Sequence, residues 1–133
     1  LVFVDTSVWI DFFRDTNSAL TARVRNLVDF ERVAVAAPVR LEVLSGASAA
    51  NWAMLVEALE PLPSFEPRES TWQLVETWMA RAIRSGQHFG IIDLLIGAIA
   101  AEQDGTLWSL DGDFMRMARL GFVELYSPGE VDA

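Results

Sequence analysis

The sequence contains neither cysteine nor lysine among its 133 residues. Without cysteine the chain can form no disulfide and no zinc–thiolate site, and it has no thiol nucleophile. This composition suits a reducing compartment. Without lysine, all ten basic residues are arginine, so any site that requires a lysine ammonium group is excluded.

Long hydrophobic runs are also missing. The longest apolar stretch covers residues 91–101 and is interrupted by Asp93, whereas a membrane span needs about 20 apolar residues. The first residues include no basic region and place Asp5 inside the first apolar run, so no secretory signal is predicted. We therefore expect a cytoplasmic protein without a membrane segment.

Positive charge is scarce. Ten basic residues stand against 19 acidic ones, which gives a formal net charge of −9. Such a surface is poorly suited to binding nucleic acid through bulk charge. A chain of this kind that acts on RNA must hold the phosphates through metal ions and a few placed arginines. Because 52% of the residues are hydrophobic, we also expect apolar surface reserved for a partner or a second subunit.

Short apolar segments alternate with helical patterns along the chain. The predicted strands cover residues 1–5, 32–36, 106–110 and 122–126. The predicted helices cover residues 7–14, 19–30, 38–44, 51–59, 69–84, 91–102 and 111–119. This alternation predicts one α/β domain over residues 1–133, with three layers and a mainly parallel sheet of about four to five short strands flanked by helices. Sites in such folds form beyond the carboxyl ends of the strands.

Four acidic residues occupy the positions where such a site would form. Asp5 ends the first predicted strand, and Asp111 follows the strand at 106–110. Glu42 and Asp93 lie within apolar helices, where an ionised carboxylate is costly unless something compensates it; Arg40 is near Glu42 in sequence but not on its helix face. Each acid alone has an ordinary structural explanation, so the ordered pattern carries the prediction.

A divalent cation would relieve the repulsion among four such carboxylates. Carboxylates brought together raise one another's pKa values. Oxygen ligands without cysteine and with a single histidine favour Mg²⁺ or Mn²⁺ over zinc. The sequence therefore predicts a site for one or two of these ions.

Four segments resemble the motifs of PIN-domain ribonucleases, in order and spacing through essentially the whole chain. These segments are VDTSVW at 4–9, PVRLEVLSG at 38–46, GIIDLLIGAIA at 90–100 and LWSLDGDF at 107–114. The short length is similar to that of VapC toxins in particular. The resemblance implies a PIN fold and RNA cleavage that depends on Mg²⁺ or Mn²⁺.

The resemblance also implies roles for individual residues. The catalytic and metal-binding set would be Asp5, Glu42, Asp93 and Asp111, with Asp113 as a further acid. Thr6, Ser7 and Ser109 match positions beside the acids where the family has small hydroxyl residues. At the position of Ser109 the family more often has threonine.

The activity implied is that of an endoribonuclease toxin, which cleaves tRNA, rRNA or mRNA through a metal-activated water. A small antitoxin would hold it inactive by laying an apolar helix in a groove, and the toxin would form a homodimer. Arg14 and Arg116 are possible phosphate contacts. We further expect Asp111 and Asp113 to diverge by about 200° of helical rotation, so that they do not easily share one ion.

Other functions fit the sequence less well. Response-regulator receivers and phosphatases with an aspartate nucleophile require a lysine, and such phosphatases carry a second aspartate where this chain has Ser7. A catalytically silent PIN module that only binds a partner is an alternative; a missing acid would have supported it, but all four are present. A structure-specific DNA nuclease is less favoured, because a short acidic chain offers no extra DNA-gripping segments.

Overall fold

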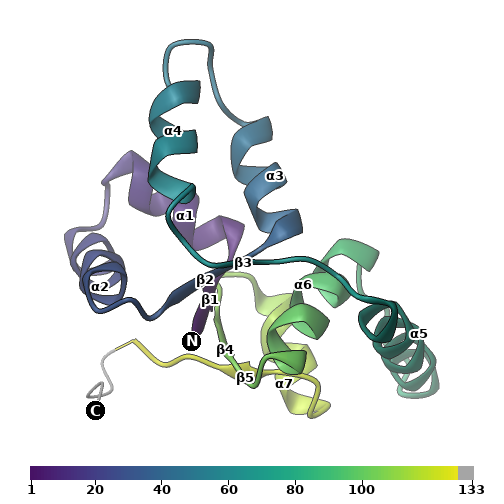
Figure 1. The fold of residues 1–133 in the computed structure, drawn as a ribbon. Helices are drawn as coiled ribbons and strands as arrows, with labels where there is room; N and C mark the ends of the chain where they lie inside the picture. Colours follow the sequence, from purple (N-terminus) through teal and green to yellow (C-terminus); the bar gives the residue numbers. More distant parts are fainter. Residues whose placement is uncertain (129–133) are drawn as a thin grey trace.

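A single parallel sheet lies at the centre of the computed structural model, which describes residues 1–128 (Figure 1). The five strands have the spatial order β3-β2-β1-β4-β5. Their bounds are β1 (Val2–Val4), β2 (Val33–Ala36), β3 (Ser64–Phe65), β4 (Thr106–Trp108) and β5 (Glu124–Leu125). All four pairings between neighbours are parallel. The predicted mainly parallel α/β architecture is confirmed.

Within residues 1–128, seven helices connect and cover these strands. They are α1 (Thr6–Arg14), α2 (Ser18–Asp29), α3 (Ala37–Ser45), α4 (Trp52–Leu59), α5 (Glu69–Arg84), α6 (Ile91–Glu102) and α7 (Gly112–Arg119). From β1 the chain moves outward through β2 to β3, then crosses back to β4 and continues to β5. Since crossovers between parallel strands are right-handed, this reversal puts α1–α4 on one face and α5–α7 on the other, as their grouping in Figure 1 indicates.

The reversal occurs between β1 and β4, which lie side by side. Val4 pairs with Trp108 at the carboxyl ends of these strands, and the Asp5 amide donates a hydrogen bond to the Trp108 carbonyl at 2.9 Å. In open α/β sheets, ligands bind in the crevice outside the strands at such a switch point. The topology therefore directs the search for a site to the residues that follow β1 and β4.

Buried apolar strands and local end signals explain most elements. Every residue of β1 and β2 is buried, as continuous apolar runs predict for a parallel sheet. Pro38 lies in the first turn of α3, and Gly46 is its C-cap. The Asn17 side chain accepts a hydrogen bond from the Leu20 amide at the start of α2.

The strand β3 and the surface of α5 differ from what the sequence indicated. β3 was not predicted, because its two residues lie between Pro63 and Pro67, are not buried, and form no apolar run. The large apolar side chains of α5 are only partly covered: Trp78 is buried, whereas Trp72 is 50% exposed. Within residues 1–128, no helix combines the length and apolarity needed to cross a membrane.

Candidate active site

Asp5 is the buried acid of the site. It follows β1 directly, and only 5% of its surface is exposed. Its Oδ2 atom accepts hydrogen bonds from the Ser109 hydroxyl at 2.7 Å and from the Ser7 hydroxyl at 3.0 Å. The Leu110 amide in turn donates to Ser7 Oγ, and the Asp111 amide donates to Ser109 Oγ, both at 3.0 Å. The two serines therefore tie the end of β1 to the segment after β4.

Glu42 is held by the hydroxyl group next to Asp5 in sequence. Thr6 Oγ1 donates to Glu42 Oε1 at 2.8 Å, which joins the start of α1 to the middle of α3. The Glu42 side chain is exposed, while Val39 and Val43 of the same helix are buried. The expectation that the Glu42 carboxylate is costly because it lies within an apolar helix is therefore wrong. Its apolar neighbours face the core, and the carboxylate does not.

Asp93 lies in the first turn of α6 and is partly buried. Its pKa is raised from the ordinary value of 3.8 to about 6. Desolvation by burial is the largest cause, followed by the negative charges of Asp111, Asp5, Asp113 and Glu42 in that order. These couplings place all five carboxylates in one electrostatic neighbourhood.

Asp111 and Asp113 flank the start of α7. Asp111 is the N-cap, and its Oδ1 accepts a hydrogen bond from the Asp113 amide at 2.9 Å. One carboxylate oxygen from each of Asp93, Asp111 and Asp113 lies within 4.8 Å of the other two. The predicted divergence of Asp111 from Asp113 is therefore wrong: Asp111 has an extended backbone, with φ −88° and ψ 128°, so helical rotation does not apply to it.

The structure divides the predicted acidic set into a close group and two neighbours. Among residues 1–128, the close group of Asp93, Asp111 and Asp113 includes neither Asp5 nor Glu42. Three hard carboxylate oxygens without a sulfur or imidazole ligand suit Mg²⁺ or Mn²⁺. Burial is the largest cause of the raised pKa of Asp93, and the negative charges that add to it are ones that a bound cation would offset.

The two predicted phosphate contacts differ in their surroundings. Arg116 is bonded within the fold: its Nη2 lies 2.8 Å from Asp113 Oδ1, and its Nη1 donates to Gln87 Oε1 at 3.2 Å. Its Cζ also lies 4.5 Å from the ring centroid of Phe89. Arg14 is exposed at the end of α1 and lines a groove that also contains Glu42.

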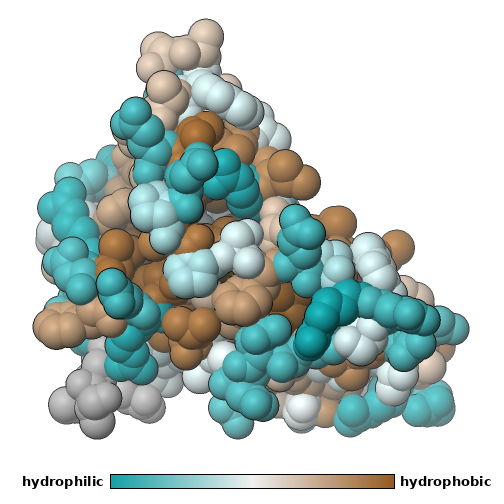
Figure 2. All heavy atoms as spheres, in the orientation of Figure 1, coloured by the Kyte–Doolittle hydropathy of each residue, from teal (hydrophilic) through white to brown (hydrophobic). Residues whose placement is uncertain are grey.

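This groove, of about 220 Å³, opens between α1, α3 and α4 and is hereafter the α1/α3/α4 groove. Its lining residues are Ile10, Phe13, Arg14, Glu42, Val43, Gly46, Asn51, Met54 and Leu55. Figure 2 shows hydrophobic atoms where α3 and α4 stand side by side. Apolar side chains thus lie next to a carboxylate of the acidic set.

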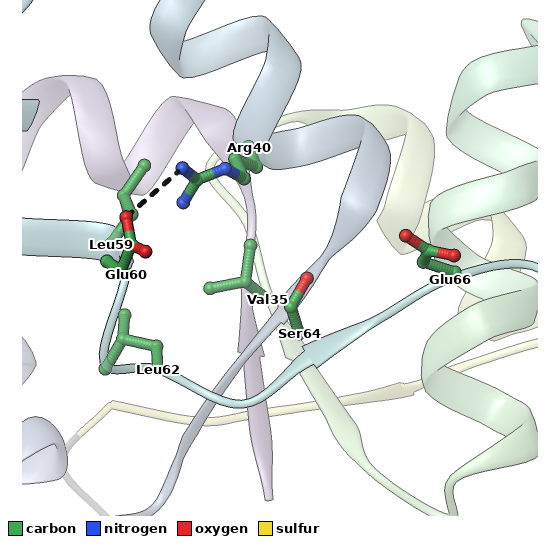
Figure 3. A pocket seen from close by; sticks show the side chains of 7 residues that line it. All are labelled: Val35, Arg40, Leu59, Glu60, Leu62, Ser64 and Glu66. Carbon is green, nitrogen blue, oxygen red and sulfur yellow. Dashed lines mark ion pairs between the residues drawn. The ribbon is translucent and has the colours of Figure 1, made fainter. Parts of the chain in front are cut away.

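A second hollow, of about 290 Å³, lies at the β3 edge of the sheet (Figure 3). Its lining residues are Val35, Arg40, Leu59, Glu60, Leu62, Ser64 and Glu66. Arg40 approaches Glu60 to 4.0 Å. Arg40 and Glu42 are two residues apart in α3, so their side chains project about 200° from each other. Arg40 therefore lines this hollow and does not neutralise the charge of Glu42, as the sequence predicted.

The segment before α6 contributes to the site without any signal in the sequence. Gln87 and Phe89 contact Arg116, 29 and 27 positions further along the chain. A single amide and a single aromatic residue in a loop have no periodic signal, so only the folded structure reveals the contact.

Comparison with protein families identifies one matching family model. The model of the PIN domain matches residues 2–120. This range contains all five carboxylates and both serines described above.

A sequence relative and two solved structures extend the comparison. The VapC ribonuclease Mb1587 of Mycobacterium bovis is 33% identical over 125 residues, covering 90% of this chain and 93% of the relative. The structure of VapBC2 from Rickettsia felis, bound to a DNA fragment from its promoter, aligns with a TM-score of 0.76 at 16% identity, covering 94% and 96% of the two chains. A toxin–antitoxin complex from Klebsiella pneumoniae aligns with a TM-score of 0.74 at 16% identity, covering 98% and 100%. The two structural likenesses concern the fold.

Proposed function

This chain belongs to the PIN domain family, and we propose that it is a metal-dependent endoribonuclease of the VapC type, the toxin of a toxin–antitoxin pair. The observation that carries the proposal is the gathering of five carboxylates near the β1/β4 switch point, where burial and the charges of the other four raise the pKa of Asp93 to about 6. The Mycobacterium bovis relative, a VapC ribonuclease that is 33% identical to this chain, supports RNA as the substrate.

The chain's own residues build the site in two parts. Asp93, Asp111 and Asp113 offer the closely spaced oxygens for one ion, and Asp5 and Glu42 offer carboxylates beside them. Ser109 and Ser7 orient Asp5, and Thr6 orients Glu42. With these donors in place, the acids are held in position before substrate arrives, which is how a preorganised site lowers a reaction barrier.

One or two bound Mg²⁺ or Mn²⁺ ions would supply the Lewis-acid charge that activates water and stabilises the leaving oxygen of a phosphodiester. Without that positive charge, the carboxylates repel the RNA backbone. The carboxylates of the site would therefore bind the metal ions that the reaction needs, and they do not attract RNA by themselves. Arg14, exposed at the end of α1, is a candidate for a phosphate contact at the rim.

The α1/α3/α4 groove is the proposed antitoxin site. Ile10 and Met54, which line it, are 37% and 48% exposed, and an amphipathic helix would cover them by placing its apolar anchors in the groove. Glu42 at the groove wall would then face a basic side chain of the antitoxin. Such a contact predicts that the antitoxin lowers metal affinity as well as activity.

A homodimer is the further assembly that we propose. Large apolar side chains are exposed away from the groove, including Trp72 and Ile83 on α5 and Ile91 and Ile92 at the start of α6. Light scattering at high protein concentration tests the proposal. A purely monomeric protein would contradict it.

The decisive test of function is RNA cleavage with a matched pair of variants. Purified protein is incubated with tRNA, rRNA and mRNA in Mg²⁺, Mn²⁺ or EDTA, and the cut ends are mapped. Wild type should cleave only with metal, and Asp93→Asn should lose nearly all cleavage while remaining folded. Asp104→Asn is the control, because Asp104 is exposed and has a φ of 53° that asparagine also adopts. Full activity of Asp93→Asn would remove Asp93 from the mechanism.

A thermal shift separates the enzyme from a silent binding module of the same fold. Mn²⁺ should raise the melting temperature of wild type, because an ion that binds only the folded state stabilises it. Cleavage of DNA but not RNA by a metal-binding protein would instead identify a DNA nuclease.

A further inference from the structure

Arg116 makes three contacts that converge on its guanidinium group. The Nη2 atom lies 2.8 Å from Asp113 Oδ1, one turn earlier in α7. The Nη1 atom donates to Gln87 Oε1 at 3.2 Å. The Cζ atom lies 4.5 Å from the centroid of the Phe89 ring, within the range of a cation–π interaction. One side chain thus bonds to a carboxylate of the close group and to two residues outside α7.

The contacts outside α7 both fall on the segment that leads into α6. Gln87 and Phe89 lie between the end of α5 and Gly90, the N-cap of α6. The first turn of that helix carries Asp93. Arg116 therefore connects the segment just before α6 to Asp113 at the start of α7, although β4 separates the two helices in the chain.

The connection is more constraining than an ordinary surface ion pair. An isolated exposed ion pair contributes little to the stability of a protein, because two long side chains lose conformational entropy when they are held together. Arg116 is already restrained by Gln87 and Phe89, and its planar group can bond in two directions at once. Since Asp113 Oδ1 is engaged by the guanidinium, the orientation of the whole carboxylate is set, and Oδ2 is left for another partner.

We propose that Arg116 is a positioning residue, which fixes Asp113 relative to the segment that leads into α6 and thereby sets the arrangement in which Asp93, Asp111 and Asp113 hold a divalent cation. This inference rests on the proposed metal-dependent function. It gives Arg116 a different role from the phosphate contact predicted from the sequence. It also gives Gln87 and Phe89 a role, as the anchors that hold the guanidinium in place.

Positioning and simple charge have opposite effects on metal binding. If Arg116 acted only through its charge, its removal would leave the carboxylates more negative and would tighten cation binding. If it positions Asp113, its removal loosens a ligand and weakens cation binding; losses of about 10- to 100-fold are typical when a partner of a metal ligand is removed. The direction of the change in Mn²⁺ affinity therefore separates the two roles.

The experiment is a calorimetric titration of Mn²⁺ into wild type and a set of variants. Arg116→Ala should raise the Kd for Mn²⁺ roughly tenfold. The Kd of Arg116→Lys should lie between those of wild type and Arg116→Ala, because lysine keeps the charge but lacks the planar guanidinium group. Gln87→Ala and Phe89→Leu should also raise the Kd, although neither changes any charge. Arg119→Ala, an exposed arginine in the same last turn of α7, should leave the Kd unchanged.

Each other outcome overturns the inference. Unchanged or tighter Mn²⁺ binding in Arg116→Ala would assign the residue to charge alone. Weaker RNA binding in EDTA with wild-type Mn²⁺ affinity would assign it to phosphate contact. A wild-type protein that binds no Mn²⁺ would overturn the proposed function as well. The metal-free melting temperature checks folding, and if Arg116→Ala does not fold, the charge-neutral Gln87→Ala variant decides the question.

Discussion

Ser109 donates a hydrogen bond from its Oγ to Asp5 Oδ2 at 2.7 Å, across 104 positions of the chain. The same Oγ accepts a hydrogen bond from the Asp111 amide at 3.0 Å. One hydroxyl group therefore links the acid that follows β1 to the acid that follows β4. These two strands are the pair at which the sheet topology reverses.

Replacement of this hydroxyl should impair the site more than the fold. Ser109→Ala removes one of the two serine donors to the buried Asp5 carboxylate, so we expect a loss of roughly tenfold in cleavage and about 1 kcal/mol in stability. Ser109→Thr keeps the hydroxyl and should retain most activity. RNA cleavage rates and urea denaturation measure the two effects, with Ser18→Ala, exposed in the first turn of α2, as control. Wild-type cleavage by Ser109→Ala would show that Asp5 needs no such support.

The raised pKa of Asp93 predicts how metal binding depends on pH. Protons compete with the ion for this carboxylate, so Mn²⁺ affinity should rise by about tenfold per pH unit up to about pH 6 and then level off. Calorimetry from pH 5 to 8 measures the curve. Constant affinity across this range would show that Asp93 is already ionised at pH 5.

The same shift has a defined sign for the metal-free protein. Between pH 3.8 and about 6, the folded state holds the Asp93 proton more tightly than the unfolded chain does. The stability contributed by this group is therefore present at low pH and is lost as the pH rises through about 6. Without metal at pH 7, Asp93→Asn should melt at a higher temperature than wild type, and the difference should shrink toward pH 4. A lower melting temperature for Asp93→Asn at pH 7 would contradict the raised pKa of Asp93.

Asp111 and Asp113 should differ in importance even though their carboxylates are close. Asp111 has the largest charge effect on Asp93, whereas Asp113 shares its charge with Arg116. We therefore expect Asp111→Asn to reduce cleavage and Mn²⁺ affinity more than Asp113→Asn does. Titration of Mn²⁺ into both variants makes the comparison. Metal binding that is abolished by Asp113→Asn and untouched by Asp111→Asn would reverse the order.

Gly105 allows α6 and β4 to connect beside the first strand. A Cβ atom at this position would lie 2.6 Å from the Phe3 ring and 3.1 Å from the Leu1 carbonyl oxygen. Because Phe3 is buried in β1, its ring has little room to move, and Gly105→Ala should cost about 1–3 kcal/mol. Gly112→Ala is the control, since a Cβ there would meet nothing within 4 Å. Denaturant unfolding measures both, and equal stabilities would show that the Phe3 ring adjusts freely.

The type of sheet and the approximate place of the acids could be predicted from local patterns alone. Buried apolar runs at β1 and β2 and the regular alternation with helices are local patterns, and local patterns specify strands and helices directly. Asp5 and Asp111 follow strands, and the carboxyl ends of parallel strands meet at one edge. The approximate location of the site therefore followed without any knowledge of contacts.

The contacts between the side chains of the site could not be predicted in this way, because they depend on how the chain folds. Asp111 turned toward Asp113 because it caps α7 with an extended backbone, and Glu42 faced outward because the buried face of α3 is occupied by Val39 and Val43. The link from Arg116 to Gln87 joins segments 29 positions apart. Such contacts depend on backbone dihedrals at caps and on long-range packing, which leave no periodic trace in a single sequence.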